Sequence, residues 1–301
     1  MSELPDLFPG FRSKRIEGEG ATIFCRLGGH GPALLLLHGF PQTHAMWHRI
    51  APELAARFSL VIADLRGYGA SDAPPDDARH TVYSKRTMAR DMVAVMNRLG
   101  HERFAIVGHD RGARVAYRMA LDTPDVVERI AVLDILPTAV YWDKLDRRFG
   151  LALYHWMFLA QPAPLPETLI GGSAGFFCDH TLAAWTRTRD LSGFDPRALE
   201  HYRAQCHDPA RIATMCADYR AGAGPDVDAD NADRAARMKI ALPLLALWGA
   251  AGLAASAGTP LEVWKAWAHD ARGAGIDSGH FIPEENPEAT LAALLPFLAG
   301  G

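Results

Sequence analysis

The stretch that decides the fold runs Phe104-Ala-Ile-Val-Gly-His-Asp-Arg-Gly-Ala-Arg114. Four apolar residues lead into a turn bounded by Gly108 and Gly112, and a helical pattern begins there. This arrangement predicts a buried strand, a very tight turn and the start of a helix. The strained turn of a nucleophile elbow requires neighbours without side chains, and glycine meets that requirement.

The residue at the centre of this turn is Asp110, where the usual elbow holds serine. A carboxylate does not follow the acyl-transfer chemistry of a serine nucleophile. It can instead displace a leaving group from an alkyl carbon and form an ester on the enzyme. The alternative is an ordinary polar loop in which Asp110 is only a helix N-cap. Motifs elsewhere in the chain are needed to distinguish these two interpretations.

Composition narrows the class of protein. The 301 residues are 49% hydrophobic, enough for a large core, and the net charge of −4 with no long basic run argues against a nucleic-acid partner. No apolar stretch reaches the ~18 residues of a membrane span. The amino terminus lacks a basic start followed by an apolar run, so we expect a cytoplasmic protein without a signal peptide. Free thiols are expected at Cys25, Cys178, Cys206 and Cys216.

Strand and helix patterns alternate along the first part of the chain. They predict a mostly parallel α/β sheet flanked by helices, with its functional site outside the carboxyl ends of the strands. Residues 138–240 contain no convincing strand and read as an inserted helical cap. We therefore expect a core formed by 1–137 and 241–301. The predicted elements are a hairpin in 13–28, strands at 33–37, 60–63, 104–108, 129–133 and 242–248, and helices at 84–99, 112–121, 261–268 and 287–298.

Two backbone amides are predicted to bind an oxyanion. The strand at 33–37 ends in His38-Gly39-Phe40-Pro41, where the glycine allows the chain to fold back and leaves the Phe40 N–H free. We pair it with the N–H of Arg111, directly after the nucleophile. The alternative is a plain strand-to-loop exit.

A histidine and a second carboxylate complete the predicted catalytic set. His280 lies in a late loop, after a glycine, and is expected to act as a general base with a pKa near the working pH. Residues 248–256 contain no carboxylate, so Asp134, at the end of the strand at 129–133, is the acid expected to orient the His280 imidazole. Asp134 could otherwise be only a capping residue.

Two arginines follow the nucleophile on the expected helix start, where cations are unfavourable beside the positive end of the helix dipole. Arg111 and Arg114 are three residues apart, so both guanidinium groups can share one face. We expect a substrate carboxylate to offset their charge, because guanidinium binds carboxylates in a planar, bidentate manner. The alternative is an ion pair with Asp110, Asp134 or a carboxylate of the cap.

No cofactor or metal is expected. His44 and His48 have the i, i+4 spacing of a helical metal pair, but neither the glutamate of H-E-x-x-H nor a third ligand is evident. The glycines near Tyr68 lack the third glycine of a dinucleotide-binding turn.

Together these motifs resemble the α/β-hydrolase superfamily over nearly the whole chain, since nucleophile, acid and histidine follow in its order. An aspartate at the elbow marks the branch that holds dehalogenases and epoxide hydrolases. Epoxide hydrolases and haloalkane dehalogenases usually carry an apolar residue, often Trp, directly after that aspartate, whereas this chain has Arg111. With its two arginines the chain looks like a fluoroacetate (haloacetate) dehalogenase.

That resemblance implies a halide pocket made of His155, Trp156 and Tyr219, three possible hydrogen-bond donors. Without it, Trp156 and Tyr219 would be read as packing residues of the cap. The resemblance also implies a small haloacid as substrate and suggests a homodimer. Two alternatives stay open: an epoxide hydrolase using the same aspartate, with Tyr219 and Tyr141 or Tyr154 as ring-opening acids, and a non-catalytic binding protein of the same fold.

Overall fold

The predicted elbow strand is β5 (Phe104–His109), and it lies near the middle of the sheet. A computed structural model describes residues 4–256 and 258–300. Within these residues eight strands form one sheet in the order β1-β2-β4-β3-β5-β6-β7-β8, parallel except at the β1–β2 and β2–β4 pairings. The other strands are β1 (Arg12–Glu17), β2 (Thr22–Gly28), β3 (Ala33–Leu37), β4 (Ser59–Ala63), β6 (Val127–Leu133), β7 (Leu244–Gly249) and β8 (Ala271–Ile276).

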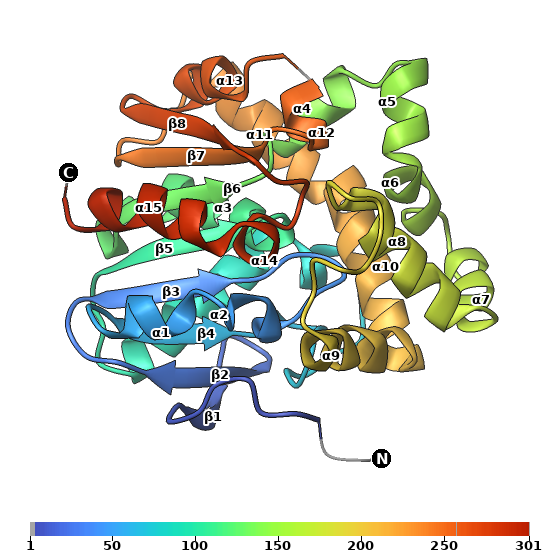
Figure 1. Cartoon of the computed structure of the whole chain (residues 1–301). Helices are drawn as coiled ribbons and strands as arrows, with labels where there is room; N and C mark the ends of the chain where they lie inside the picture. Colours follow the sequence, from blue (N-terminus) through green and yellow to red (C-terminus); the bar gives the residue numbers. More distant parts are fainter. Residues whose placement is uncertain (1–3, 257, 301) are drawn as a thin grey trace.

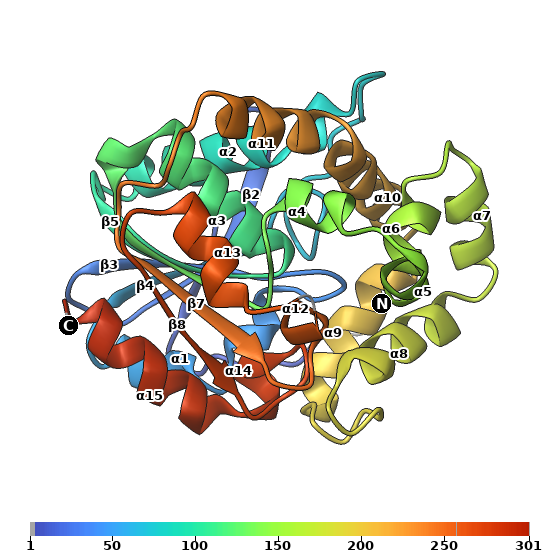
Figure 2. The same cartoon turned by 90° about the horizontal axis from the view of Figure 1, so that it is seen from above.

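Helices cover both faces of the sheet (Figure 2). On one face lie α1 (Ala51–Ala55) and α15 (Pro287–Leu298), and on the other α2 (Lys85–Arg98), α3 (Arg111–Asp122) and α13 (Pro260–Trp267). This double cover explains the continuous apolar run of β3, in which all five residues are buried. Shorter helices are η1 (His44–Trp47), η2 (Thr81–Tyr83), η3 (Pro124–Val126), α12 (Leu253–Ser256) and α14 (Ile282–Glu285).

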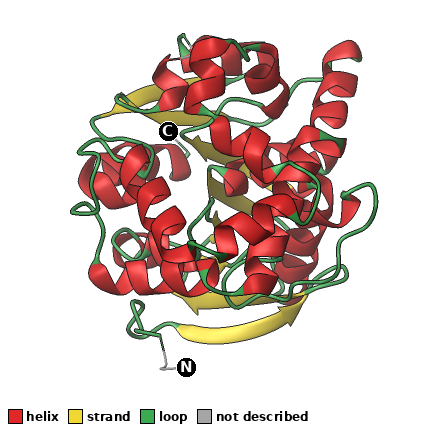
Figure 3. Ribbon diagram, turned by 90° about the vertical axis from the view of Figure 1, so that its right-hand side faces the viewer, coloured by secondary structure: helices red, strands yellow, loops and turns green. Residues whose placement is uncertain are grey.

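Most of a run of helices between β6 and β7 sits against the carboxyl ends of the strands, at the right of Figure 1 and toward the viewer in Figure 3. No strand occurs among the described residues between β6 and β7. This run supports the division into core, 138–240 cap and core, which we keep as a proposal. Its members are α4 (Thr138–Asp143), α5 (Arg147–Ala152), α6 (Tyr154–Leu159), α7 (Leu165–Gly171), α8 (Ala174–Trp185), α9 (Pro196–Cys206), α10 (Pro209–Ala223) and α11 (Pro225–Ala235).

The α/β prediction is confirmed, with one strand missed. β8 reads Ala-Arg-Gly-Ala-Gly-Ile, without the apolar run that marked the other strands. It lies at the edge of the sheet, where fewer side chains are buried, and most of its residues are half-buried or exposed. In the part of the chain that the structure describes, no helix is both long and apolar enough to cross a membrane.

Candidate active site

The turn after β5 has the strained geometry that its glycines predict. Asp110 adopts φ 45° and ψ −113°, a conformation that costs a non-glycine residue roughly 1–3 kcal/mol. A Cβ on Gly108 would lie 2.6 Å from the backbone of Ala113, and one on Gly112 would lie 2.4 Å from the carbonyl oxygen of Leu37. Both glycines are therefore required by close backbone contact, and the turn presents the Asp110 side chain beyond the end of the sheet.

The strand end at His38–Pro41 does fold back onto the aspartate. The N–H of Phe40 donates a 2.9 Å hydrogen bond to Oδ1 of Asp110. Gly39 makes this approach possible, because a Cβ there would lie only 2.4 Å from Cβ of Asp110. One carboxylate oxygen is thus held by a backbone donor, which leaves Oδ2 as the oxygen free to react. The Arg111 amide, the second predicted donor, stays a prediction.

His280 and Asp134 meet although 146 residues separate them. Nδ1 of His280 lies 2.6 Å from Oδ2 of Asp134, while Oδ1 accepts a 2.9 Å hydrogen bond from the N–H of Gly249. Glycine is needed here too, since a Cβ on Gly252 would lie 2.9 Å from Asp134. Residues 248–256, which contain no carboxylate, instead pack their backbone around Asp134, which follows the preceding strand, β6.

The protonation of these groups suits a nucleophile and a base. Burial raises the pKa of the Asp110 carboxyl, but His280, Arg114 and Arg111 outweigh burial and hold that pKa below its ordinary value. Burial lowers the pKa of His280, but its hydrogen bond to Asp134 and the charges of Asp134 and Asp110 leave it raised above 6.5. The Nε2 atom of His280 is buried without a hydrogen-bond partner in the structure, so it is free to bind a water or substrate.

The two arginines converge, but they are not equivalent. The guanidinium carbons of Arg111 and Arg114 lie 6.0 and 4.7 Å from the ring centroid of Trp156. Arg111 donates from Nε and Nη2 to the carboxylate of Asp218 at 2.9 and 2.6 Å, so the alternative of an ion pair with a cap carboxylate is realised in α10. Arg114 donates from Nη1 to Leu136 and Thr138.

Each arginine nevertheless keeps one buried nitrogen without a partner. These atoms are Nη1 of Arg111 and Nε of Arg114. A buried guanidinium N–H without a partner is costly. Both arginines therefore retain a donor for an anion, which is compatible with the predicted carboxylate-binding role.

The predicted halide-binding residues gather on the cap side. The ring of His155 lies 5.7 Å from that of Tyr219, and the rings of Trp156 and Tyr219 are 6.2 Å apart. Burial lowers the pKa of His155 to about 3, so the imidazole is neutral, and its Nδ1 is buried without a partner. Their placement matches the resemblance, while their role stays a prediction.

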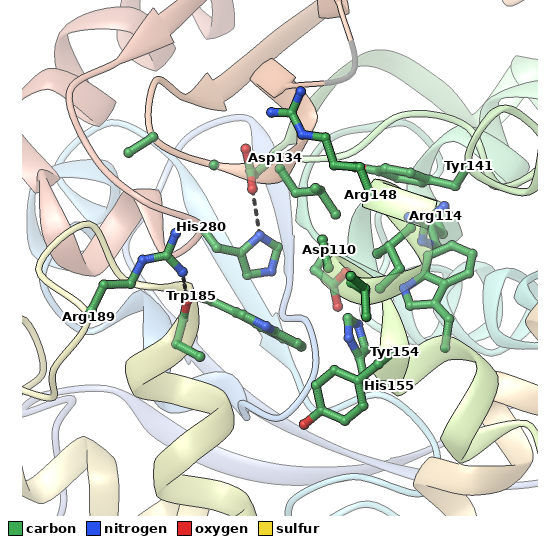
Figure 4. A pocket seen from close by; sticks show the side chains of 18 residues that line it. Asp110, Arg114, Asp134, Tyr141, Arg148, Tyr154, His155, Trp185, Arg189 and His280 are labelled. Carbon is green, nitrogen blue, oxygen red and sulfur yellow. Dashed lines mark hydrogen bonds and ion pairs between the residues drawn. The ribbon is translucent and has the colours of Figure 1, made fainter. Parts of the chain in front are cut away.

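A cavity of about 480 Å³ opens over these groups. In Figure 4 the His280 side chain lies between Asp134 and Asp110, and His155 and Arg114 border the same space. Trp156 also lines the cavity, whereas Phe40, Arg111 and Tyr219 are not among its lining residues. Among residues 4–256 and 258–300, no group of three or more His, Cys, Asp and Glu side chains is placed to hold a metal ion.

Trp185 and Asp218 are among the residues at the site that the sequence did not predict. Trp185, at the end of α8, lines the cavity, and its ring lies 4.5 Å from that of His155 and 5.3 Å from that of His280. Asp218 directly precedes Tyr219, but an isolated aspartate on a predicted helix carries no signal of burial. Its position between Arg111 and Lys85 is evident only in the folded chain.

Comparison with known proteins agrees with this geometry. The family model for the alpha/beta hydrolase fold matches residues 32–287. A fluoroacetate dehalogenase from Burkholderia sp. is 45% identical over 97% of this chain and 95% of its own. A soluble epoxide hydrolase from Corynebacterium sp. (strain C12) is 30% identical over 90% of this chain and 91% of its own.

Solved structures give the same picture. A protein from Nostoc sp. PCC 7120, described as a candidate alpha/beta hydrolase, superimposes with a TM-score of 0.94 at 46% identity, covering 97% of this chain and 99% of its own. The family match over most of the chain, the mostly parallel sheet and the near-complete relatives lead to one conclusion. This chain belongs to the α/β-hydrolase family, and within it the chain is similar to a fluoroacetate dehalogenase.

Proposed function

We propose that this protein hydrolyses fluoroacetate, and other short 2-haloacids, to glycolate and halide through an ester on Asp110. One observation carries the proposal: Asp110 lines the same cavity as Arg114, His155 and His280, each of which has a buried nitrogen atom without a hydrogen-bond partner. A haloacid offers a carboxylate, a halogen and an electrophilic carbon, which these groups complement. The 45% identical relative named as a fluoroacetate dehalogenase supports the same chemistry.

In the first step the substrate carboxylate binds to the free donors of Arg111 and Arg114. Oδ2 of Asp110 attacks the α-carbon in line as the carbon–halogen bond breaks, because Oδ1 is held by the Phe40 amide. The halide leaves with the bonding electron pair toward His155, Trp156 and Tyr219. Fluoride is a poor leaving group, so N–H and O–H donors aimed at the developing charge lower the barrier.

In the second step Nε2 of His280 removes a proton from water, and the resulting hydroxide adds to Cγ of Asp110. The oxyanion forms on the oxygen that the Phe40 amide already contacts, and the Arg111 amide is its proposed second donor. Asp134 stabilises the imidazolium that results. Collapse breaks the bond between Cγ and the ester oxygen, and that oxygen takes the proton from the His280 imidazolium and leaves as the hydroxyl group of glycolate. The Asp110 carboxyl then loses its proton to solvent, which restores the carboxylate.

The resemblance suggests the oligomeric state, and the sequence itself suggests the location of the protein in the cell. We propose a homodimer, which sedimentation analysis tests directly, and a cytoplasmic location. The four cysteines are free and buried in the structure, which fits a reducing compartment. Neither step requires a cofactor.

Halide release is the test. The wild-type protein is expected to release fluoride from fluoroacetate, read with an ion-selective electrode, and chloride from chloroacetate. Asp110→Asn should fold and release none in the first turnover. His280→Asn should accumulate the ester, visible as added mass on the peptide that contains Asp110. Normal turnover by freshly purified Asp110→Asn, or an unmodified Asp110 in His280→Asn after exposure to substrate, contradicts the mechanism.

An epoxide hydrolase is the second candidate, and the Corynebacterium relative together with tyrosines in the cavity wall favours it. Tyr141 and Tyr154 both line the cavity, whereas Tyr219 does not. The two unpartnered arginine nitrogens argue against a neutral epoxide, because they would stay buried without a partner. A panel of epoxides assayed beside fluoroacetate separates the two activities. Haloacid binding without turnover would instead support a non-catalytic binding protein.

A further inference from the structure

The loop that carries His280 joins β8 to α14, and each N–H group around the histidine has an assigned acceptor. The N–H of His280 donates to the carbonyl oxygen of Trp185 at 2.9 Å. The carbonyl oxygen of His280 accepts from the N–H of Ile282 at 3.0 Å and lies 2.9 Å from Nε2 of His109. The two backbone N–H groups that flank the histidine, on Gly279 and Phe281, both donate hydrogen bonds to a single side chain.

That side chain is the carboxylate of Glu285, at the end of α14. Its Oε2 accepts from the N–H of Gly279 at 2.9 Å, and its Oε1 accepts from the N–H of Phe281 at 2.9 Å. Oε2 also accepts from the N–H of Arg187 at 2.7 Å. One carboxylate thus receives three backbone donors, and an ionised acceptor makes such bonds roughly twice as strong as neutral ones.

The Arg187 contact ties the catalytic loop to the cap. Arg187 follows Trp185 by two residues, so the segment after α8 both receives the His280 N–H and donates to Glu285. The backbones meet so closely that a Cβ on Gly279 would lie 2.5 Å from the Arg187 nitrogen. Trp185 in turn lines the cavity next to His280 (Figure 4).

We propose that Glu285 is a positioning residue that sets the orientation of His280 for ester hydrolysis and holds the Trp185 wall of the cavity against it. The hydrogen bond to Asp134 fixes Nδ1 of His280. The direction in which Nε2 points depends also on the position of the His280 backbone. Three hydrogen bonds from the backbone of residues 279, 281 and 187 to the Glu285 carboxylate supply that constraint. Glu285 does not line the cavity, so it acts on the reaction only through these backbone contacts.

This proposal rests on the proposed function, and it predicts different effects on formation of the Asp110 ester and on its hydrolysis. Attack by Asp110 on the α-carbon does not use His280, whereas hydrolysis of the ester does. Glu285→Gln keeps the shape, but it replaces one accepting oxygen with an N–H₂ donor that faces backbone N–H groups. Because a misplacement of about 1 Å can cost on the order of 100-fold, we expect ester hydrolysis to slow by about 10- to 100-fold.

The test follows both steps with chloroacetate, since chloride is the better leaving group. Rapid mixing measures the first-turnover chloride release, and mass spectrometry follows the decay of the Asp110 ester after dilution. Glu288→Gln, an exposed residue three positions along in α15, is the matched control and is expected to equal wild type in both steps. Glu285→Gln is expected to keep first-turnover release within about threefold, while its ester decays about 10- to 100-fold more slowly.

Equal slowing of both steps in Glu285→Gln, or unchanged ester decay, overturns the proposal. If circular dichroism shows that Glu285→Gln does not fold, Glu285→Asp is tested instead, because it keeps the negative charge on a shorter side chain. Glu285→Asp must then slow ester hydrolysis selectively, by a smaller factor.

An NMR titration of His280, whose signal is assigned by comparison with His280→Asn, adds a measurement that does not depend on turnover. Its pKa should fall in Glu285→Gln, because the Glu285 charge contributes to raising it. An unshifted His280 titration also contradicts the proposal, whereas a wild type that forms no ester overturns the proposed function itself.

Discussion

Replacing Asp218 with asparagine should destabilise this protein more than its single lost charge suggests. The Asp218 side chain is completely buried and lies between two buried cations, Arg111 and Lys85, whose side chains are 1% and 2% exposed. It also accepts a 2.7 Å hydrogen bond from the hydroxyl of Tyr68. Asparagine would remove the negative charge and turn an N–H₂ donor toward Arg111 or Lys85, which can only donate.

The magnitude follows from the two cations left behind. Breaking a buried ion pair by removing one partner costs about 3–5 kcal/mol, because a buried charge loses its compensation. Asp226 lies 3.5 Å from Lys85 and partly compensates that lysine, so we expect the lower half of this range. At about 2.1 cal/mol/K per residue, 301 residues give an unfolding entropy of about 0.6 kcal/mol/K, so Tm should fall by about 5–7 °C.

Thermal unfolding followed by circular dichroism measures this change, with Asp228→Asn, an exposed position in α11, as the matched control. Burial raises the pKa of Asp218, but Arg111 and Lys85 outweigh it and hold that pKa far below its ordinary value. A depressed pKa stabilises the folded state above the unfolded pKa of about 3.9, and the contribution is lost as the pH falls through the lower, folded value. The difference between wild type and Asp218→Asn should therefore be constant from about pH 7 to 5 and narrow below about pH 4.

A fall in Tm no larger than that of Asp228→Asn would refute the reasoning. It would mean that Arg111 and Lys85 find other partners without Asp218, so that Asp218 does not hold Arg111 in place. A Tm difference that widened toward acid would refute the assigned sign of the pKa shift.

Three further outcomes are expected. Gly39→Ala places a methyl group 2.4 Å from Cβ of Asp110, so halide release should fall by about 100-fold; a wild-type rate in the electrode assay contradicts the close contact. Hydrolysis of the Asp110 ester should decline as the pH falls through a value above 6.5, because His280 must be neutral to act and Asp134 raises its pKa; a flat profile down to about pH 6 counts against that assignment. Arg114→Leu should raise the KM for haloacetate by about 10- to 100-fold, the worth of one hydrogen bond to a charged group, and an unchanged KM would remove Arg114 from carboxylate binding.

Much of the fold was readable from local patterns. The strand, turn and helix around Asp110 were predictable because close contacts within the turn and with the neighbouring strand require the glycines on either side. The neighbouring strand was predictable from its continuous apolar run. Asp134 could be chosen because the next strand end offers no carboxylate, and the structure places it 2.6 Å from His280. β8 escaped prediction because an edge strand need not be apolar.

The sequence by itself determined the α/β framework, the strained aspartate turn and the order in which Asp110, Asp134 and His280 follow along the chain, because each depends on neighbouring residues or on chain order. Only the tertiary structure decided which charges meet. Arg111 is 107 residues from Asp218, and Glu285 is 98 residues from Arg187. No local pattern encodes such pairings, because burial and partner are set by how the cap helices pack on the ends of the strands.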